Sequence, residues 1–200
     1  MHADHRFPTV TRVPRSAPPT VAAWACRSVP IACAAIAVLL LTRGPAAAQD
    51  VTEPALKAAF IFNFAQFTEW PADVLPASEP VVLCVLGDPA VGDALVRTVK
   101  GRYLRGHSLA VRDVARARPE RVCHVLYLSG VTAAQAAESI DGLRDVPVLT
   151  ISDIERFTEL GGIAQFSFEH GRLRFSVRFE SVKRARLEIS SRLLQLSQQK

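Results

Sequence analysis

The sequence contains few of the residues that mark several common protein classes. It has four cysteines, two tryptophans, two tyrosines and one methionine among 200 residues. It contains no internal repeat, no low-complexity segment, and no linker long enough to divide the chain beyond residue 48. However, 49% of the residues are apolar and 22% are charged, which supplies one hydrophobic core and excludes a disordered tail protein.

Catalytic and metal-binding motifs with fixed spacings are also missing. No C-x-x-C, H-E-x-x-H or G-x-S-x-G pattern occurs. Segment 87–92 has the spacing of a phosphate loop, but Asp93 and Ala94 stand where lysine and serine or threonine are required, so we interpret it as a turn. Cys123 and His124 are neighbours in a predicted strand, so they face opposite sides and form no thiol–imidazole pair. We therefore expect no enzymatic activity, no cofactor and no metal site.

The longest apolar run, 29–42, is too short to cross a bilayer, which takes about 20 apolar residues. Four arginines precede the run, and the small residues Ala46 and Ala48 follow it. This order predicts a secretory signal peptide over 1–48, cleaved between Ala48 and Gln49, with one domain over 49–200. No adjacent arginine pair precedes the run, which favours the general export route. The alternative is an uncleaved membrane anchor.

The positive charge of the chain lies largely in this leader. The whole chain has a net charge of +5. The leader holds five of the 24 basic and one of the 19 acidic residues, which leaves 19 basic against 18 acidic residues, a net charge of +1. We therefore expect no nucleic-acid partner, because such proteins need a basic face. We interpret two local basic clusters as solvated faces. They are Arg112, Arg116, Arg118 and Arg121, and Lys183, Arg184 and Arg186.

Two cysteines remain after removal of the leader, which carries Cys26 and Cys33. An even number in an oxidising compartment favours a disulfide between Cys84 and Cys123. That bond would close a loop of about 40 residues and stabilise the fold by about 4 kcal/mol. The alternative is a pair of buried free thiols, because both cysteines lie in apolar runs that predict buried strands.

The apolar pattern of the mature chain predicts an α/β fold. Strands at 81–86, 108–114, 122–128 and 146–151 are interleaved with helices at 90–100 and 132–143, as in a sheet covered on both faces. We expect a single domain with a mixed, mostly parallel β-sheet of about six strands flanked by helices, ending in a C-terminal β-hairpin and helix.

The C-terminal part shows a different periodicity. Alternation with period two over 163–168 and 172–179, around a short glycine turn, predicts the hairpin. A last helix is expected over 181–197, broken near 187–190, with Ser190 or Ser191 as its cap. The side chains expected on the apolar side of the hairpin are Leu173, Phe175, Val177 and Phe179.

Segment 51–70 predicts the first helix of the domain. Apolar side chains from Leu56 to Phe67 recur at spacings of four, four and three, which places them on one stripe. Thr52 is expected to cap the helix and Pro71 to end it after Trp70. Two interpretations stay open: the aromatic face packs in the core, or part of it contacts a partner protein. The candidates for that contact are Phe60, Phe64, Phe67 and Trp70.

Several segments together resemble the YfiR family of exported regulatory proteins. Residues 56–71 resemble the opening signature of that family. The resemblance covers nearly all of the expected mature chain, from about residue 53 to 197. Further blocks follow in the family's order at 83–87, 123–127, 148–153, 161–163, 174–175 and 189–194.

The resemblance implies a periplasmic protein that represses an inner-membrane GGDEF diguanylate cyclase, which lowers cyclic di-GMP and biofilm formation. It also implies a homodimer, sequestration by an outer-membrane lipoprotein, and redox-sensitive disulfides. Cys84 and Cys123 match one cysteine pair of the family, whereas the second pair falls on Thr158 and Gln165, so at most one bridge remains. The alternative is a periplasmic small-ligand binding or sensing domain acting on another membrane partner, with loops 87–88 and 161–162 framing its pocket.

Overall fold

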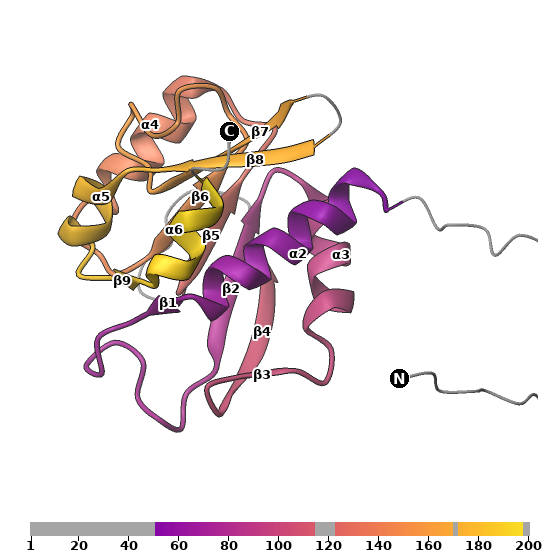
Figure 1. Ribbon diagram of the computed structural model, residues 1–200, viewed down its shortest axis with the longest axis vertical. Helices are drawn as coiled ribbons and strands as arrows, with labels where there is room; N and C mark the ends of the chain where they lie inside the picture. The colour runs from indigo at the N-terminus through magenta and orange to yellow at the C-terminus, as the bar shows by residue number, and fades with distance from the viewer. Residues whose placement is uncertain (1–50, 115–122, 170–171, 198–200) are drawn as a thin grey trace, which may run out of the picture. The chain divides into compact units, whose positions relative to one another are not determined.

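The computed structural model of the chain describes residues 51–114, 123–169 and 172–197 (Figure 1). Several predicted features lie outside these residues. They are the leader 1–48 with the Ala48–Gln49 cleavage site, three members of the first arginine cluster (Arg116, Arg118 and Arg121), and the hairpin turn at 170–171.

Within the part of the chain that the structure describes, seven strands form one mixed sheet in the order β3-β4-β2-β5-β6-β7-β8 (Figure 1). Neighbours from β4 to β7 are parallel, whereas β3 and β8 pair antiparallel at the two edges. The predicted α/β class, mostly parallel sheet and C-terminal hairpin are therefore confirmed. The sheet has one strand more than expected because β3 spans only two residues, too few to leave a periodic signal. The strands are β2 (Val81–Leu86), β3 (Tyr103–Leu104), β4 (His107–Asp113), β5 (Val125–Leu128), β6 (Leu149–Ser152), β7 (Ala164–Glu169) and β8 (Arg172–Val177).

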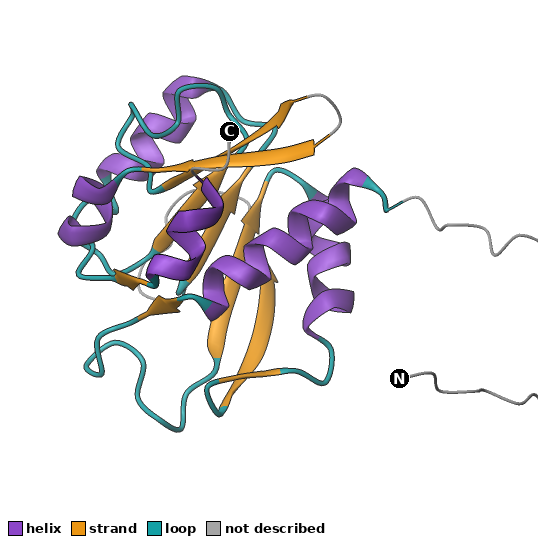
Figure 2. Cartoon of the chain, viewed as in Figure 1, coloured by secondary structure: helices purple, strands orange, loops and turns teal. Residues whose placement is uncertain are grey.

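Helices cover both faces of the sheet (Figure 2). Within the described residues, they are α2 (Glu53–Gln66), α3 (Pro89–Val99), α4 (Ala133–Asp141), α5 (Phe179–Arg184) and α6 (Ser191–Ser197). Successive side chains of β2 serve two cores: Leu83 packs in the cluster that contains α2 and α3, and Cys84 packs in the cluster that contains α4. Burial on both faces explains why β2 is apolar throughout. No helix within the described ranges has the length and apolar character needed to span a membrane.

Helix α2 ends at Gln66, earlier than predicted. The next residues form the short strand β1 (Thr68–Glu69), which pairs antiparallel with β9 (Glu188–Ile189). The predicted helical continuation to Trp70 is wrong, because pairing with a segment more than a hundred residues away replaces the last helical turn. Thr52 lies at the N-cap, but its side chain makes no capping hydrogen bond.

Aromatic rings attach α2 to the C-terminal hairpin. Phe64 stacks edge-on to Phe175 of β8, with 4.9 Å between ring centroids, and lies 5.7 Å from Phe166 of β7. Phe60 approaches the same two rings at 6.0 and 6.3 Å. Three of these four contacts are edge-to-face, a favourable geometry for aromatic pairs. The first interpretation of the aromatic helix, packing in the core, therefore holds for much of its surface.

The chain after β8 confirms one expectation and corrects another. The predicted break in the last helix is present, since β9 separates α5 from α6, and Ser190 Oγ accepts a hydrogen bond from the Arg192 amide at 3.4 Å. The prediction that Phe179 lies on the apolar side of the hairpin is wrong. The strand ends at Val177, and Phe179 instead begins α5 with 47% of its surface exposed.

Candidate functional site

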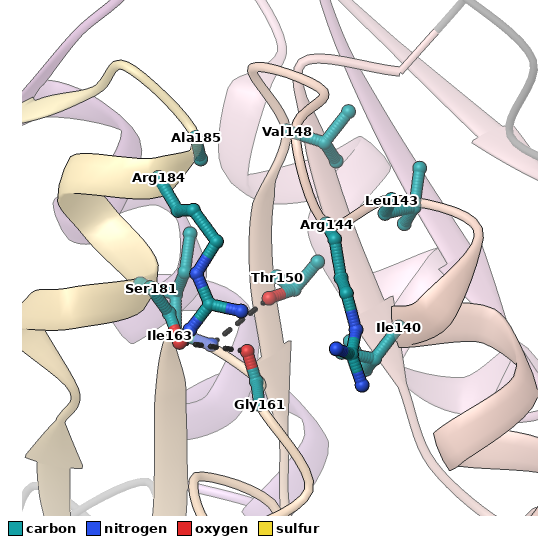
Figure 3. A pocket seen from close by; sticks show the side chains of 10 residues that line it. All are labelled: Ile140, Leu143, Arg144, Val148, Thr150, Gly161, Ile163, Ser181, Arg184 and Ala185. Atoms are coloured by element: carbon teal, nitrogen blue, oxygen red, sulfur yellow. Dashed lines mark hydrogen bonds between the residues drawn. The ribbon is translucent and has the colours of Figure 1, made fainter.

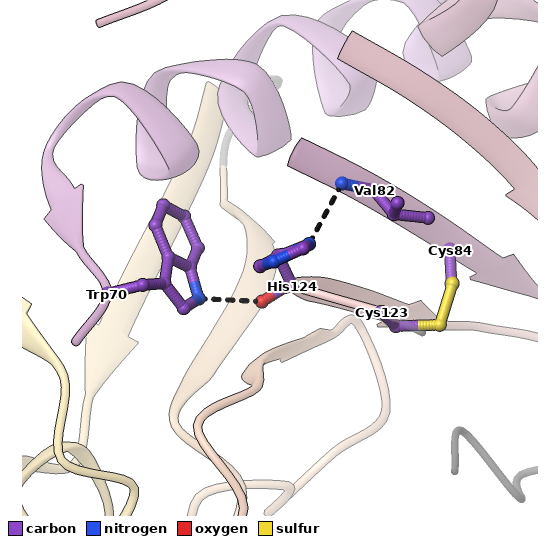
Figure 4. The surroundings of a disulfide bond; sticks show 5 residues. All are labelled: Trp70, Val82, Cys84, Cys123 and His124. Atoms are coloured by element: carbon purple, nitrogen blue, oxygen red, sulfur yellow. Dashed lines mark hydrogen bonds between the residues drawn. A yellow bond between two sulfur atoms is a disulfide. The ribbon is translucent and has the colours of Figure 1, made fainter. Parts of the chain in front are cut away.

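The structure joins Cys84 and Cys123 in a disulfide (Figure 4). Cys84 lies in β2 and Cys123 just before β5, with their Cα atoms 5.7 Å apart. Both residues are buried in the core cluster that contains α4. Of the two alternatives that the sequence leaves open, the structure therefore contains the bridge.

His124 lies beside this disulfide and points away from it (Figure 4). Its Nδ1 accepts a hydrogen bond from the Val82 amide at 3.1 Å, and its carbonyl oxygen accepts one from Trp70 Nε1 at 3.1 Å. The indole of Trp70 lies edge-on to the imidazole, with 6.0 Å between centroids. The two side chains point in different directions, as expected, although neither residue belongs to a strand, because β5 begins at Val125. His124 ties Trp70 to the start of β5.

The pH dependence of stability is expected to reflect His124. Burial lowers the pKa of His124 below its ordinary value of 6.5. Protonation would also remove the acceptor that the Val82 amide uses. Because the unfolded chain binds the proton more readily, the free energy of unfolding falls as the pH drops below 6.5 towards the folded pKa.

In His124→Asn, the Oδ1 atom can accept the hydrogen bond from the Val82 amide. We therefore expect the free energy of unfolding of this variant to fall less than that of wild type as the pH drops. Urea unfolding followed by tryptophan fluorescence at about pH 7.5 and about pH 5.5 measures it. An identical fall in wild type and His124→Asn would show that another group titrates.

A largely buried ionic cluster lies at the carboxyl-terminal edge of the sheet. Lys57 of α2 places its Nζ 2.7 Å from Asp153 Oδ2 and 2.7 Å from Glu53 Oε1. Tyr127 of β5 and Ser129, which follows it, each donate a hydroxyl hydrogen bond to the same Asp153 oxygen at 3.0 Å. The cluster thus connects α2 to the ends of β5 and β6.

The protonation states of this cluster are fixed by burial and by its internal hydrogen bonds. Burial lowers the pKa of Lys57, but hydrogen bonds to Asp153 and Glu53 outweigh burial and raise it above its ordinary value. Burial raises the pKa of Asp153, but hydrogen bonds from Lys57 and Ser129 outweigh burial and keep it below its ordinary value. Burial and the Asp153 charge both raise the pKa of Tyr127. At neutral pH the cluster therefore holds an ammonium, a carboxylate and a neutral phenol, which act as a fixed link.

Sequence reasoning assigned no role to Lys57 or Asp153, although both lie in blocks that resemble the family. The available signal was positional: Ser129 and Asp153 each follow a buried parallel strand directly, at the edge where polar residues of α/β sheets gather. Lys57 stands 96 residues from Asp153, so no local pattern pairs them. Within the described ranges, no three His, Cys, Asp or Glu side chains are grouped to hold a metal ion.

The outward side of α2 carries no charged residue between Leu56 and Phe67. We call this the uncharged α2 face. The two charged residues of the helix, Glu53 and Lys57, pair with each other. An exposed helix face normally carries charges, so this composition is typical of a contact surface. The half-buried or exposed residues of the face are Leu56, Ala59, Phe60, Asn63, Gln66 and Phe67.

The four candidate partner residues differ in exposure. Phe64 is completely buried, so its side chain offers no surface to a partner. Phe60, Phe67 and Trp70 are half-buried and pack against the core with part of their surface. A partner contact by these three residues, which the structure leaves accessible, stays a prediction.

The two glycine loops that the ligand-binding alternative requires lie at opposite ends of the parallel strands. Gly87 follows β2 at the carboxyl-terminal edge, whereas 161–162 precede β7, which runs parallel to β2, at the amino-terminal edge. The expectation that they frame one pocket is therefore wrong. Gly87 has φ +85°, and a Cβ there would collide with the Ser129 carbonyl. Asp88 Oδ1 accepts the Val91 amide at 3.1 Å and caps α3, as the turn interpretation of 87–92 requires.

Comparison with known proteins identifies one family. A family model described as YfiR/HmsC-like matches residues 54–198, which is well over half of the chain. The matched range contains both cysteines of the disulfide, the uncharged α2 face, and every member of the ionic cluster except Glu53. No curated protein matches the chain.

Proposed function

The chain belongs to the YfiR/HmsC-like family, and from this we propose that it is a periplasmic repressor of an inner-membrane GGDEF diguanylate cyclase. The family suggests a periplasmic regulator of cyclic di-GMP signalling that acts on a membrane signalling partner, and it is regulatory rather than catalytic. The match over residues 54–198 is the observation that carries the proposal. Export through the general route, with cleavage after Ala48, is part of the same proposal.

Repression requires that the regulator bind the inactive arrangement of the cyclase more tightly than the active one. The uncharged α2 face supports this role because it can be buried against a partner without desolvating a charge. The ionic cluster and the aromatic contacts with the hairpin hold α2 in place, which limits the conformational entropy lost on binding. We further propose a homodimer, and an outer-membrane lipoprotein that sequesters the regulator and releases the cyclase.

The direct test is a pull-down of the tagged mature protein from solubilised envelope membranes, with cellular cyclic di-GMP measured beside it. We expect recovery of a membrane diguanylate cyclase, and a higher cyclic di-GMP level in a deletion strain than in wild type. Absence of a cyclase from the recovered proteins, together with an unchanged cyclic di-GMP level, would contradict the proposal.

A charge on the uncharged α2 face is expected to relieve repression. Ala59→Glu and Asn63→Glu each place a carboxylate on this face, and burying it without a partner should weaken cyclase binding by roughly tenfold to a hundredfold. Cellular cyclic di-GMP should then rise towards the level of the deletion strain.

Ala134→Glu is the matched control for this prediction, because Ala134 is an exposed alanine of α4 on the opposite face of the sheet. It should repress like wild type. Melting temperatures of the purified proteins separate loss of binding from loss of folding. If both α2 variants fold and repress normally, the uncharged α2 face is not the binding surface.

A further inference from the structure

A small hollow lies at the amino-terminal edge of the sheet, where the end of α4, the turn before β7 and α5 meet (Figure 3). Its lining is apolar at Ile140, Leu143, Ile163 and Ala185. About 20 Å³ of it is accessible to water, which is room for about one water molecule, so only the head group of a larger ligand can enter it. This place lies outside the uncharged α2 face and the ionic cluster.

Two arginines from different elements flank the hollow, and only one of them is paired. Arg144 donates through Nε and Nη2 to Asp141 Oδ1 at 3.0 and 2.7 Å. Arg184, in the last turn of α5, forms no hydrogen bond or ion pair with any residue that the structure describes. Figure 3 shows its side chain extending across the hollow towards Thr150 and Gly161. One positive charge at this place is therefore not neutralised.

A hydroxyl group adds a second unused donor. Thr150 is only 4% exposed, and its Oγ1 accepts the Ile163 amide at 3.0 Å. The proton of this hydroxyl donates to no other group among the described residues. The neighbouring Ser181 hydroxyl, in contrast, donates to the Gly161 carbonyl at 2.8 Å. The guanidinium of Arg184 and the hydroxyl of Thr150 thus offer donors to the same small space.

We propose that this hollow binds a single carboxylate group. One uncompensated guanidinium matches one negative charge, whereas a phosphate group carries close to two. A carboxylate can accept two hydrogen bonds from the fork of a guanidinium, and the carbon that bears it would rest on Ile140 and Leu143. This binding site goes beyond the proposed repression of a cyclase and does not depend on it.

A purely structural role of Arg184 has to be distinguished from carboxylate binding. Cations near the end of a helix interact favourably with the helix dipole, and Arg184 lies in the last turn of α5. Arg97 lies in the last turn of α3 and is also exposed, so Arg97→Gln is the matched control. If the dipole is the whole explanation, Arg184→Gln and Arg97→Gln will behave alike.

The experiment titrates the full mature protein with acetate and with inorganic phosphate at constant ionic strength, and follows the amide signals of Thr150 and Ile163 by NMR. We expect saturable shifts with acetate, weaker binding of phosphate, and a loss of acetate affinity of about tenfold or more in Arg184→Gln. Thr150→Val should lose affinity in the same direction, and Arg97→Gln should change it by less than about twofold.

Non-saturable shifts, tighter binding of phosphate, or equal affinities in Arg184→Gln and Arg97→Gln would overturn the proposal. A short peptide with one glutamate, compared with its glutamine version, distinguishes the sources of the carboxylate. Tighter binding of the glutamate peptide than of acetate assigns the carboxylate to a protein side chain, and equal affinity assigns it to a small free acid. Because no cyclase takes part, failure of this test leaves the proposed repression untouched.

Discussion

Replacing Lys57 by methionine is expected to lower the free energy of unfolding by about 3 kcal/mol. The side chain of Lys57 is 8% exposed and that of Asp153 is 21% exposed, so solvent screens the pair only weakly. Methionine fills a similar volume but leaves the Asp153 carboxylate with two hydroxyl donors and no cation. The charge then remains in a largely buried place without its partner, which is the costly outcome for an ion pair. Urea unfolding of the mature protein at neutral pH measures the loss.

Arg105→Met is the matched control, because Arg105 pairs with Glu69 at 2.8 Å while both side chains are largely exposed. Its removal should cost less than about 0.5 kcal/mol. In the double variant Lys57→Met with Asp153→Leu, the total loss should be smaller than the sum of the two single losses, because the unpaired charge is gone. Equal losses in Lys57→Met and Arg105→Met would contradict a structural role for the ionic cluster.

Acid provides an independent check of the same link. The pKa of Asp153 is lowered in the folded protein, so its contribution to stability is present above the ordinary value of 3.8 and is lost as the pH falls through the folded pKa. Lys57→Met removes the largest contribution that lowers the pKa of this carboxyl, so its pKa should be higher in the variant than in wild type. The deficit of the variant relative to wild type should therefore shrink as Asp153 becomes protonated in acid.

The sheet was the most predictable part of the fold because its strands are buried on both faces. Strand β2 occupies the range that its apolar run predicts, 81–86. The periodicity of the sequence predicted the wrong conformation where a segment far away in the chain determines it. The aromatic stripe of α2 continues to Trp70, but pairing of β1 with β9 ends the helix at Gln66. Phe179 continues the alternation of β8, but the chain has already turned into α5.

The candidate site was less predictable than the fold, for two physical reasons. Apolar residues surround α2, so periodicity did not tell which aromatic side chains face outward; the structure buries Phe64 and leaves Phe60 half-buried. Lys57 and Asp153 meet only because the fold brings α2 to the end of β6. The disulfide could be predicted from the sequence because two cysteines in an oxidising compartment commonly form a bond.

The disulfide is positioned to restrain the region that includes Trp70. Cys123 is the chain neighbour of His124, whose carbonyl accepts the Trp70 indole hydrogen bond. The bridge holds this backbone segment against β2, and Val82 of β2 in turn donates to the His124 ring. Loss of the bridge therefore loosens this segment at Cys123, whereas the backbone hydrogen bonds of His124 with Val82 and Leu149 remain.

Removing the bridge in the variant Cys84→Ala with Cys123→Ala is expected to lower the free energy of unfolding by about 4 kcal/mol. The bond closes a long loop that holds α3 and β4, so most of the effect comes from the greater freedom of the unfolded chain. Because both sulfurs are buried, reductant must be applied to the unfolded protein before refolding. Urea unfolding of wild type and variant, each with and without dithiothreitol, measures the loss.

Wild type refolded in reductant should approach the stability of the double variant, and reductant should leave the variant itself unchanged. This second comparison is the control, because it separates loss of the bond from any other effect of dithiothreitol. A wild-type protein whose stability is the same in both conditions would mean that Cys84 and Cys123 are not bridged in solution. In that case the β2–β5 ladder, from the pair Leu83 and Val125 onward, would have to hold the His124 segment without covalent help.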